Sequence, residues 1–324
     1  MNMSEPSSTQ TESATAIRVE GLGKTFPDGA QALQAVDFSL FAGELCALIG
    51  ENGSGKSTLL KILFGALRAD EGRVGVFDCD PCVDGAAVRR RTGFAEQDPI
   101  LDPEMTGWET LRLFYALRGL AHRSRQPRLA ALAEEYDLGA FCHRRIARYS
   151  GGQRQRLHLA VETMHDPRLL LLDEPTASLD PDGRRDFWRR LVQWRDAGRT
   201  ILVATHDLSD VSAHCDRLLL FQGGRLLAAD TPAAVAAAHS RSRAVIELWE
   251  APLDTESLRR ELSGLAGVTD VNIDDRRVTL WRDRPPEHGE LAFDVLAARG
   301  VGFRSYEQQE PDLASAYFRL TGGA

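Results

Sequence analysis

The chain has 324 residues, 43% of them hydrophobic, and is long enough to form two domains or one large one. Its formal net charge of −8 argues against a surface that binds nucleic acid. No run of about 18 apolar residues occurs, so the sequence predicts no membrane-spanning helix. The five cysteines, an odd number in a chain of this length, favour reduced cytosolic thiols over a disulfide framework.

The beginning of the chain predicts a tail followed by a pair of strands. Residues 1–15 are rich in Ser and Thr and lack both a basic start and an apolar stretch, so we expect a disordered tail rather than a signal peptide. Alternating apolar and polar residues then predict two strands, Ala16–Glu20 and Ala35–Leu40. The segment Lys24–Gly29 is predicted to be a turn between them.

The most informative segment is residues 50–57, Gly-Glu-Asn-Gly-Ser-Gly-Lys-Ser, which has the G-x-x-x-x-G-K-[ST] form of a phosphate-binding loop. A short buried strand, Glu44–Ile49, is predicted before it, and Thr58–Phe64 after it has helical apolar spacing. The loop therefore precedes a helix N-terminus, where free N–H groups and the helix dipole favour phosphate. Lys56 would add a charge near the β- and γ-phosphates, and the Ser57 hydroxyl can ligate Mg²⁺.

The next segments predict two further strands, Gly72–Phe77 and Thr92–Gln97. Between them, Cys79 and Cys82 have C-x-x-C spacing, but a structural zinc site would need a second pair of ligands, and the sequence nearby has none. We therefore interpret the two cysteines as incidental thiols in a turn.

The segment Thr106–Leu138 has a helical pattern. Five apolar side chains in it form a stripe that we expect in the core: Trp108, Leu111, Phe114, Tyr115 and Leu117. The proline-rich loop 98–103 before it is predicted to be exposed, with its apolar pair Ile100 and Leu101. This pair is either a docking surface for a partner or part of the packing of the helical segment.

Two later segments have polar groups at positions where ligands bind. Residues 149–156 form a glycine turn that opens a helix, which is a second candidate anion site. Four leucines at 169–172 predict a buried central strand that ends in Asp173 and Glu174. A strand end with a capping residue would explain one acid but not two in succession. Thr200–His206 repeats this pattern, so we favour a functional role for His206 over a structural one.

In chain order, the sequence thus holds residues 50–57, Gln97, Ser150-Gly151-Gly152-Gln153, Asp173-Glu174, Ser178-Leu179-Asp180 and His206. From about Ile17 to Ser240 it resembles the ATP-binding-cassette (ABC) ATPases, through their Walker A, Q-loop, signature, Walker B, D-loop and switch-histidine motifs. One difference is Tyr149, which stands where Leu usually opens the signature. The resemblance implies an α/β P-loop NTPase fold: a RecA-like core with an antiparallel β subdomain and a helical signature subdomain.

The resemblance also implies catalytic roles. Asp173 would hold Mg²⁺ through water, with Ser57 and Gln97 in or near its coordination shell. Glu174 would be the general base that polarises the attacking water, and His206 would contact the γ-phosphate and orient that water. Gln97, Glu174 and His206 are therefore the predicted catalytic residues, and ATP and Mg²⁺ are the predicted cofactors.

The predicted nucleotide contacts include one aromatic residue. By analogy with the family, Phe26 would stack on the adenine ring, and the alternative is a core residue at a strand edge. The full predicted set is Phe26, Gly50, Asn52, Gly53, Ser54, Gly55, Lys56, Ser57, Thr58, Ser150, Gly151, Gly152, Gln153 and Asp180. The signature residues would bind an ATP held by a second subunit. One Walker A and one signature per chain therefore predict a head-to-tail dimer, most simply of two identical copies.

The last part of the chain predicts a small, separate α+β domain. Its pattern is a βαββαβ order, which is typical of a ferredoxin-like fold. The predicted elements are Ala244–Trp249, Thr255–Leu265, Val268–Ile273, Arg277–Trp281, Pro286–Arg299 and Val301–Tyr306. We therefore predict a tail at 1–15, an ATP-binding domain at 16–240 and an accessory domain at 241–324.

The tail segment Glu310–Gly322 resembles that of ABC-2 type exporter ATPases, the group that includes daunorubicin-resistance pumps. The sequence thus predicts the ATPase subunit of an exporter, working with separate membrane permease subunits and lying in the cytoplasm on the inner face of the membrane. The alternatives are an importer ATPase and a non-transport ABC protein. A single cassette without sustained heptads or zinc-ligand pairs argues against the latter.

Overall fold

The structure, a computed structural model, describes residues 14–97, 101–282 and 290–322. It divides into two compact units, Met1–Asp230 and Thr231–Ala324. Most of the predicted tail, residues 1–13, lies outside the described residues, whereas Thr15 already opens the first strand. No helix in the described ranges combines the length and the apolar character needed to cross a membrane.

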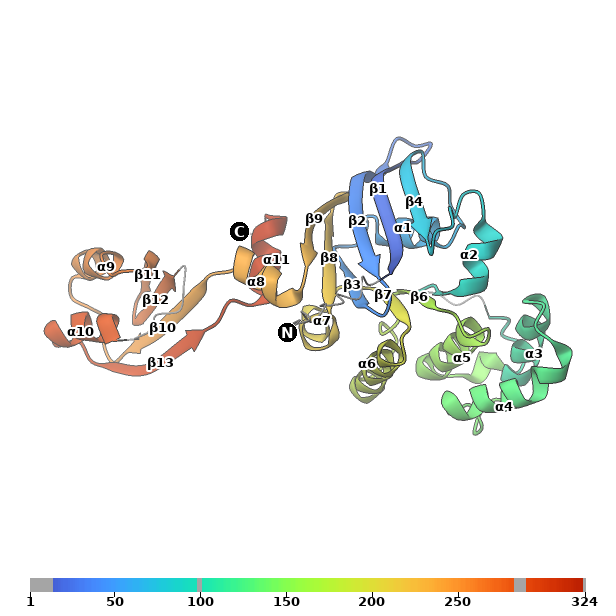
Figure 1. Cartoon of the computed structure of the whole chain (residues 1–324). Helices are drawn as coiled ribbons and strands as arrows, with labels where there is room; N and C mark the ends of the chain where they lie inside the picture. Colours follow the sequence, from blue (N-terminus) through green and yellow to red (C-terminus); the bar gives the residue numbers. More distant parts are fainter. Residues whose placement is uncertain (1–13, 98–100, 283–289, 323–324) are drawn as a thin grey trace, which may run out of the picture. The chain divides into compact units, whose positions relative to one another are not determined.

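The first unit begins with a three-stranded antiparallel sheet in the order β2-β1-β4 (Figure 1). Its strands are β1 (Thr15–Thr25), β2 (Gln31–Phe41) and β4 (Glu71–Val76). The alternation seen in the sequence places Ile17, Val19 and Val36 in the core. The predicted turn joins β1 to β2.

The second sheet of this unit has six strands in the order β5-β6-β7-β3-β8-β9. They are β3 (Leu45–Ile49), β5 (Thr92–Ala95), β6 (Leu169–Asp173), β7 (Thr200–Thr205), β8 (Arg217–Gln222) and β9 (Arg225–Asp230). All neighbours are parallel except β8 and β9, which are antiparallel. The carboxyl ends of β3, β6 and β7 therefore meet at one edge of the sheet.

Helices cover both faces of this sheet, which explains the run of four leucines in β6. Leu170 and Leu172 lie in a core cluster with residues of α5 (Gly151–Thr163) and α6 (Pro181–Asp196). Leu169 and Leu171 lie in another cluster with α1 (Lys56–Leu63). Side chains of a strand alternate between faces, so a strand buried on both sides must be apolar throughout. The remaining helices of the core are α2 (Gly85–Arg91) and α7 (Leu208–His214).

The predicted helical segment forms α3 (Gly107–Leu117), the 3₁₀ turn His122–Ser124 and α4 (Arg125–Glu135). A second 3₁₀ turn, Ile146–Arg148, precedes α5. Of the predicted stripe, Leu111 and Tyr115 are buried, and Trp108 and Phe114 pack partly against the same cluster. The prediction for Leu117 is wrong, because this side chain is 70% exposed. Nine residues beyond Trp108, it points to the opposite side of the helix.

The loop before α3 agrees with expectation in part. Ile100 lies outside the described residues. Leu101 is half-buried: it packs partly against the core cluster of the helical segment, and the residues that follow it, 102–104, are exposed. The packing that the sequence left open is therefore present in part, and a docking role for this residue stays a prediction.

The second unit contains a four-stranded antiparallel sheet in the order β11-β12-β10-β13. Its elements are β10 (Ser242–Leu248), α9 (Thr255–Ser263), β11 (Val268–Asp274), β12 (Arg277–Arg282), α10 (Glu290–Ala298) and β13 (Phe303–Gln309). This order and direction are those of a ferredoxin-like domain, as the sequence predicted.

Two helices flank this ferredoxin-like sequence of elements, α8 (Pro232–His239) before it and α11 (Leu313–Thr321) after it. They pack against each other, so α8 groups with the second unit. The division of the chain therefore falls after Asp230, whereas the sequence placed it after residue 240. Contact between helices so far apart in the chain is not visible in local sequence patterns.

Candidate functional site

The phosphate-binding loop lies between β3 and α1, as its sequence predicted. Gly55 precedes the helix with φ of +103°, and no side chain caps the first N–H groups of α1. A Cβ atom on Gly50 would lie 2.4 Å from the carbonyl oxygen of Phe221, and one on Gly55 would lie 2.3 Å from that of Ala32. Only glycine fits at these two positions, and the uncapped N–H groups suit an anion.

The polar side chains of the loop also fit a phosphate. Lys56 is 6% exposed, and its Nζ donates to the carbonyl oxygens of Gly50 at 2.6 Å and Glu51 at 3.1 Å. Burial lowers the pKa of Lys56, and the carboxylates of Glu174 and Asp173 oppose this by favouring the charged form. The Oγ of Ser54 is buried and has no hydrogen-bond partner among the described residues. These groups can satisfy their hydrogen bonding on a ligand's phosphate oxygens.

The two acids at the end of β6 are both buried, Asp173 with 5% and Glu174 with 8% of its surface exposed. Glu174 has φ of +46°, a left-handed conformation that is strained for this residue type. Its backbone N–H donates to the carbonyl of Ala204 at 3.0 Å, which attaches this turn to the neighbouring strand β7. The strained turn therefore gives the Glu174 carboxylate a fixed position at the sheet edge.

Two predicted residues from two other elements lie beside that carboxylate. His206, at the end of β7, places Nδ1 3.0 Å from Oε2 of Glu174. Lys56, at the start of α1, places Nζ 4.0 Å from Oε1. This Oε1 is buried and accepts no hydrogen bond from any described residue. A buried carboxylate oxygen of this kind can accept a proton from a water molecule held beside it.

The predicted metal ligands lie on elements that end at the same edge. Ser57 is on the first turn of α1, and Asp173 ends β6. Gln97 follows β5, the strand next to β6, and is exposed. Hydroxyl, carboxylate and amide oxygens are suitable donors for Mg²⁺.

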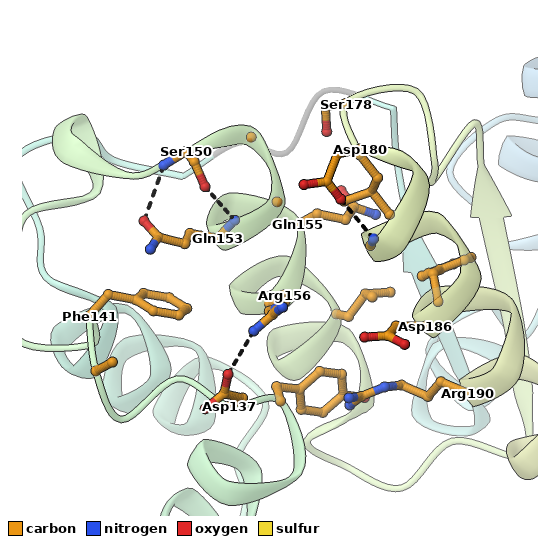
Figure 2. A pocket seen from close by; sticks show the side chains of 18 residues that line it. Asp137, Phe141, Ser150, Gln153, Gln155, Arg156, Ser178, Asp180, Asp186 and Arg190 are labelled. Carbon is orange, nitrogen blue, oxygen red and sulfur yellow. Dashed lines mark hydrogen bonds and ion pairs between the residues drawn. The ribbon is translucent and has the colours of Figure 1, made fainter.

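The predicted signature residues form a second group. Ser150 caps α5, with its side chain accepting from the N–H of Gln153 and its own N–H donating to the Gln153 side chain. Asp180 caps α6 in the same way, accepting from the N–H of Gly183 at 2.7 Å. Figure 2 shows these caps at the rim of a cleft of about 580 Å³ between α5 and α6. Within the described ranges, no hydrogen bond or ion pair joins this group to Lys56, Glu174 or His206.

Phe26 lies in the turn between β1 and β2, and it is half-buried. The Nζ of Lys24 lies 5.8 Å from the centre of its ring. The approach of Ala32 to Gly55 brings the start of β2 against the phosphate-binding loop. Stacking of Phe26 on adenine stays a prediction.

Some contacts around the site could not be foreseen. Arg184 of α6 makes an ion pair of 2.8 Å with Asp207, the residue after His206. Asp207 also caps α7, by accepting from the N–H groups of Ser209 and Asp210. The only sign of this helix cap in the sequence was that an acid, Asp207, directly follows the predicted His206.

Comparison with known proteins agrees with this geometry. Residues 33–177 match a family model described as ABC transporter. The chain is also 33% identical over 308 residues to the daunorubicin resistance ATP-binding protein DrrA3 of Streptomyces coeruleorubidus, covering 95% of this chain and 96% of that protein. The chain belongs to the ABC transporter family. As an ABC ATPase it binds and hydrolyses ATP.

Other members of the ABC family resemble this chain over most of its length or over about two thirds of it. The Nod factor export ATP-binding protein I of Bradyrhizobium diazoefficiens is 33% identical over 307 residues, 95% of this chain and 96% of that protein. A solved dimeric structure of the cassette MJ0796, in a post-hydrolysis state with ADP and Pi, has a TM-score of 0.61 and 25% identity. It covers 66% of this chain and 98% of its own. The predicted P-loop NTPase fold is confirmed.

The C-x-x-C pair of this ABC ATPase lies away from the predicted site, in the turn after β4, and both thiols are half-buried and free. No cluster of three or more possible metal-binding side chains occurs in the described part of the chain. The double variant Cys79→Ser with Cys82→Ser should therefore keep the parental ATPase rate and metal content. Steady-state phosphate release and elemental analysis test this. Stoichiometric zinc in the parent that is lost in the variant would overturn the interpretation.

Proposed function

We propose that this chain is the ATP-hydrolysing subunit of an exporter, and that it drives transport through separate membrane permease subunits. The observation that carries the enzymatic part is the buried Glu174 carboxylate with Lys56 and His206 beside it. The names of DrrA3, of the Nod factor protein and of a fluoroquinolones export protein of Mycobacterium tuberculosis support export rather than import. A match over 95% of the chain must also include most of the second unit.

Each residue of the site has a chemical task under this proposal. Lys56 and the uncapped N–H groups of α1 bind the β- and γ-phosphates of ATP. Glu174 accepts a proton from the attacking water, and His206 contacts the γ-phosphate and holds the Glu174 carboxylate in place. Ser57, Asp173 and Gln97 would hold Mg²⁺, which supplies positive charge against the phosphates when it is bound.

The separation of the predicted residues into two groups supports a composite site. Among the described residues of one chain, no hydrogen bond or ion pair joins Ser150, Gly151 and Gly152 to the Lys56–Glu174–His206 group. A head-to-tail dimer with two-fold symmetry would bring the signature of each copy to the ATP held by the other. Two solved MJ0796 cassette structures are described as dimeric.

This function implies a peripheral position on the inner face of the membrane, where ATP is available and the permease is reached. The test is expression of the chain with candidate membrane permeases of the same organism, followed by affinity purification in detergent. We expect the two proteins to copurify and to carry out ATP-dependent transport in vesicles. An ATPase that hydrolyses ATP but never associates with a membrane protein would contradict the exporter assignment and leave the enzymatic one intact.

The predicted metal ligand Gln97 gives a separate test. Gln97→Ala should lower the ATP turnover of the isolated protein roughly tenfold, the size of effect seen when a group supporting a metal site is removed. The melting temperature should not change, because Gln97 is exposed. The matched control is Gln193→Ala, at an exposed glutamine of α6. If the rate and its dependence on Mg²⁺ concentration are the same in both variants, Gln97 is not a metal ligand.

A further inference from the structure

The signature helix contains a buried polar side chain that none of the assigned roles uses. Gln155 of α5 is 5% exposed, and its Nε2 has no hydrogen-bond partner among the described residues. An unpaired amide donor inside a protein destabilises the conformation that contains it. Met has a similar length and volume and would fill the space without this penalty. Packing alone therefore does not explain an amide at this position.

Acceptors without a hydrogen bond lie on the other side of the cleft. Gln155 lines the cleft together with the segment Ser178–Asp180. In Figure 2 its side chain extends from α5 toward that segment. In the part of the chain that the structure describes, the carbonyls of Ser178 and Leu179 accept no hydrogen bond. The buried donor of Gln155 thus faces a partly exposed segment with two carbonyls that have no protein donor among the described residues.

The same segment lies between the backbone of Glu174 and the start of the signature helix. At one end, the N–H of Ala177 donates to the carbonyl of Glu174 at 3.3 Å. At the other, a Cβ atom on Gly151 would lie only 3.0 Å from the carbonyl oxygen of Ser178. Because the two backbones are in such close contact, a shift of the segment would also displace the start of α5.

We propose that Gln155 is a positioning residue that couples the signature helix to the segment Ser178–Asp180. In the ATP-bound dimer its amide donates to the carbonyl of Ser178 or Leu179, and this bond fixes the segment between the signature and Glu174. The inference rests on the proposed function, because it needs the composite site of the dimer. Because the donor is unpaired in the structure and paired in the ATP-bound dimer, the new bond favours closure.

The test is Gln155→Met, with Gln193→Met on the exposed face of α6 as the matched control. Both are made in the parent and in a Glu174→Gln background. We expect Gln155→Met to melt at or above the parental temperature, because the unpaired donor is gone. ATP-driven dimerisation, measured by analytical ultracentrifugation, should weaken roughly tenfold per site, the factor that corresponds to one net hydrogen bond. ATP binding to the monomer should not change.

If Gln155 had only a structural role, its replacement would not raise the melting temperature and at the same time weaken ATP-driven dimerisation. If Gln155→Met dimerises like the control, the inference is wrong. If the Glu174→Gln background itself does not dimerise with ATP, the composite site is wrong instead. Should Gln155→Met not fold, Gln155→Asn keeps the amide but is too short to cross the cleft. It is expected to weaken dimerisation to the same extent as Gln155→Met, and dimerisation like that of the control would overturn the inference.

Discussion

Glu174→Gln should bind ATP with parental affinity and hydrolyse it at least about 100-fold more slowly, since a general base contributes roughly 10²–10⁴-fold to the rate. The amide keeps the shape of the side chain and loses its affinity for a proton. The structure adds that Oε1 is buried and has no hydrogen-bond partner among the described residues. Oε2 lies 3.0 Å from Nδ1 of His206. The variant should therefore bind its substrate normally and lack the group that activates water.

Two measurements test this prediction. Steady-state phosphate release gives the rate, and sedimentation with Mg-ATP shows whether a dimer accumulates, because blocked hydrolysis prevents the opening that follows product formation. The matched control is Glu134→Gln, at an exposed carboxylate of α4, which should behave like the parent. A turnover of Glu174→Gln near the parental rate would remove Glu174 from the role of base.

The parts of the site that follow from local patterns were predicted from the sequence. Residues 50–57 identify a phosphate-binding loop by themselves, and the leucine run before Asp173 identifies a strand buried on both faces. Since parallel strands end at one edge, a sequence argument can also place Asp173 and His206 near Lys56. Only the structure shows that Nδ1 of His206 and Nζ of Lys56 lie near different oxygens of the Glu174 carboxylate.

The features that could not be predicted from the sequence depend on contacts between distant segments. Leu117 was assigned to the core because it is apolar, but it points to the side of α3 opposite Trp108. The boundary after Asp230 depends on α8 packing against α11. The missing hydrogen-bond partner of Gln155 is visible only when burial and every neighbour are known. Local periodicity contains none of this information.

Lys56→Ala should abolish ATP binding or weaken it by roughly 10- to 100-fold, because a charge-assisted hydrogen bond contributes about 1.5–3 kcal/mol. The Nζ of Lys56 now donates to the carbonyl oxygens of Gly50 and Glu51, within the loop that would receive the phosphates. Its position at the start of α1 adds its charge to the helix dipole. Lys56→Arg should not restore binding, since the broad planar guanidinium does not fit the tight loop that the ammonium fits.

The chain offers a closely matched control for this charge change. Lys61 lies on the same helix, but its side chain is 45% exposed and pairs with Glu96 at 3.3 Å on the surface. Lys61→Ala removes the same charge from α1 and should leave ATP affinity within about twofold of the parent, because exposed ion pairs contribute at most about 1 kcal/mol. Isothermal titration with ATP measures both variants. Parental affinity in Lys56→Ala would mean that residues 50–57 do not bind the phosphates. An equal loss in both variants would mean that the helix charge matters and the position of Lys56 does not.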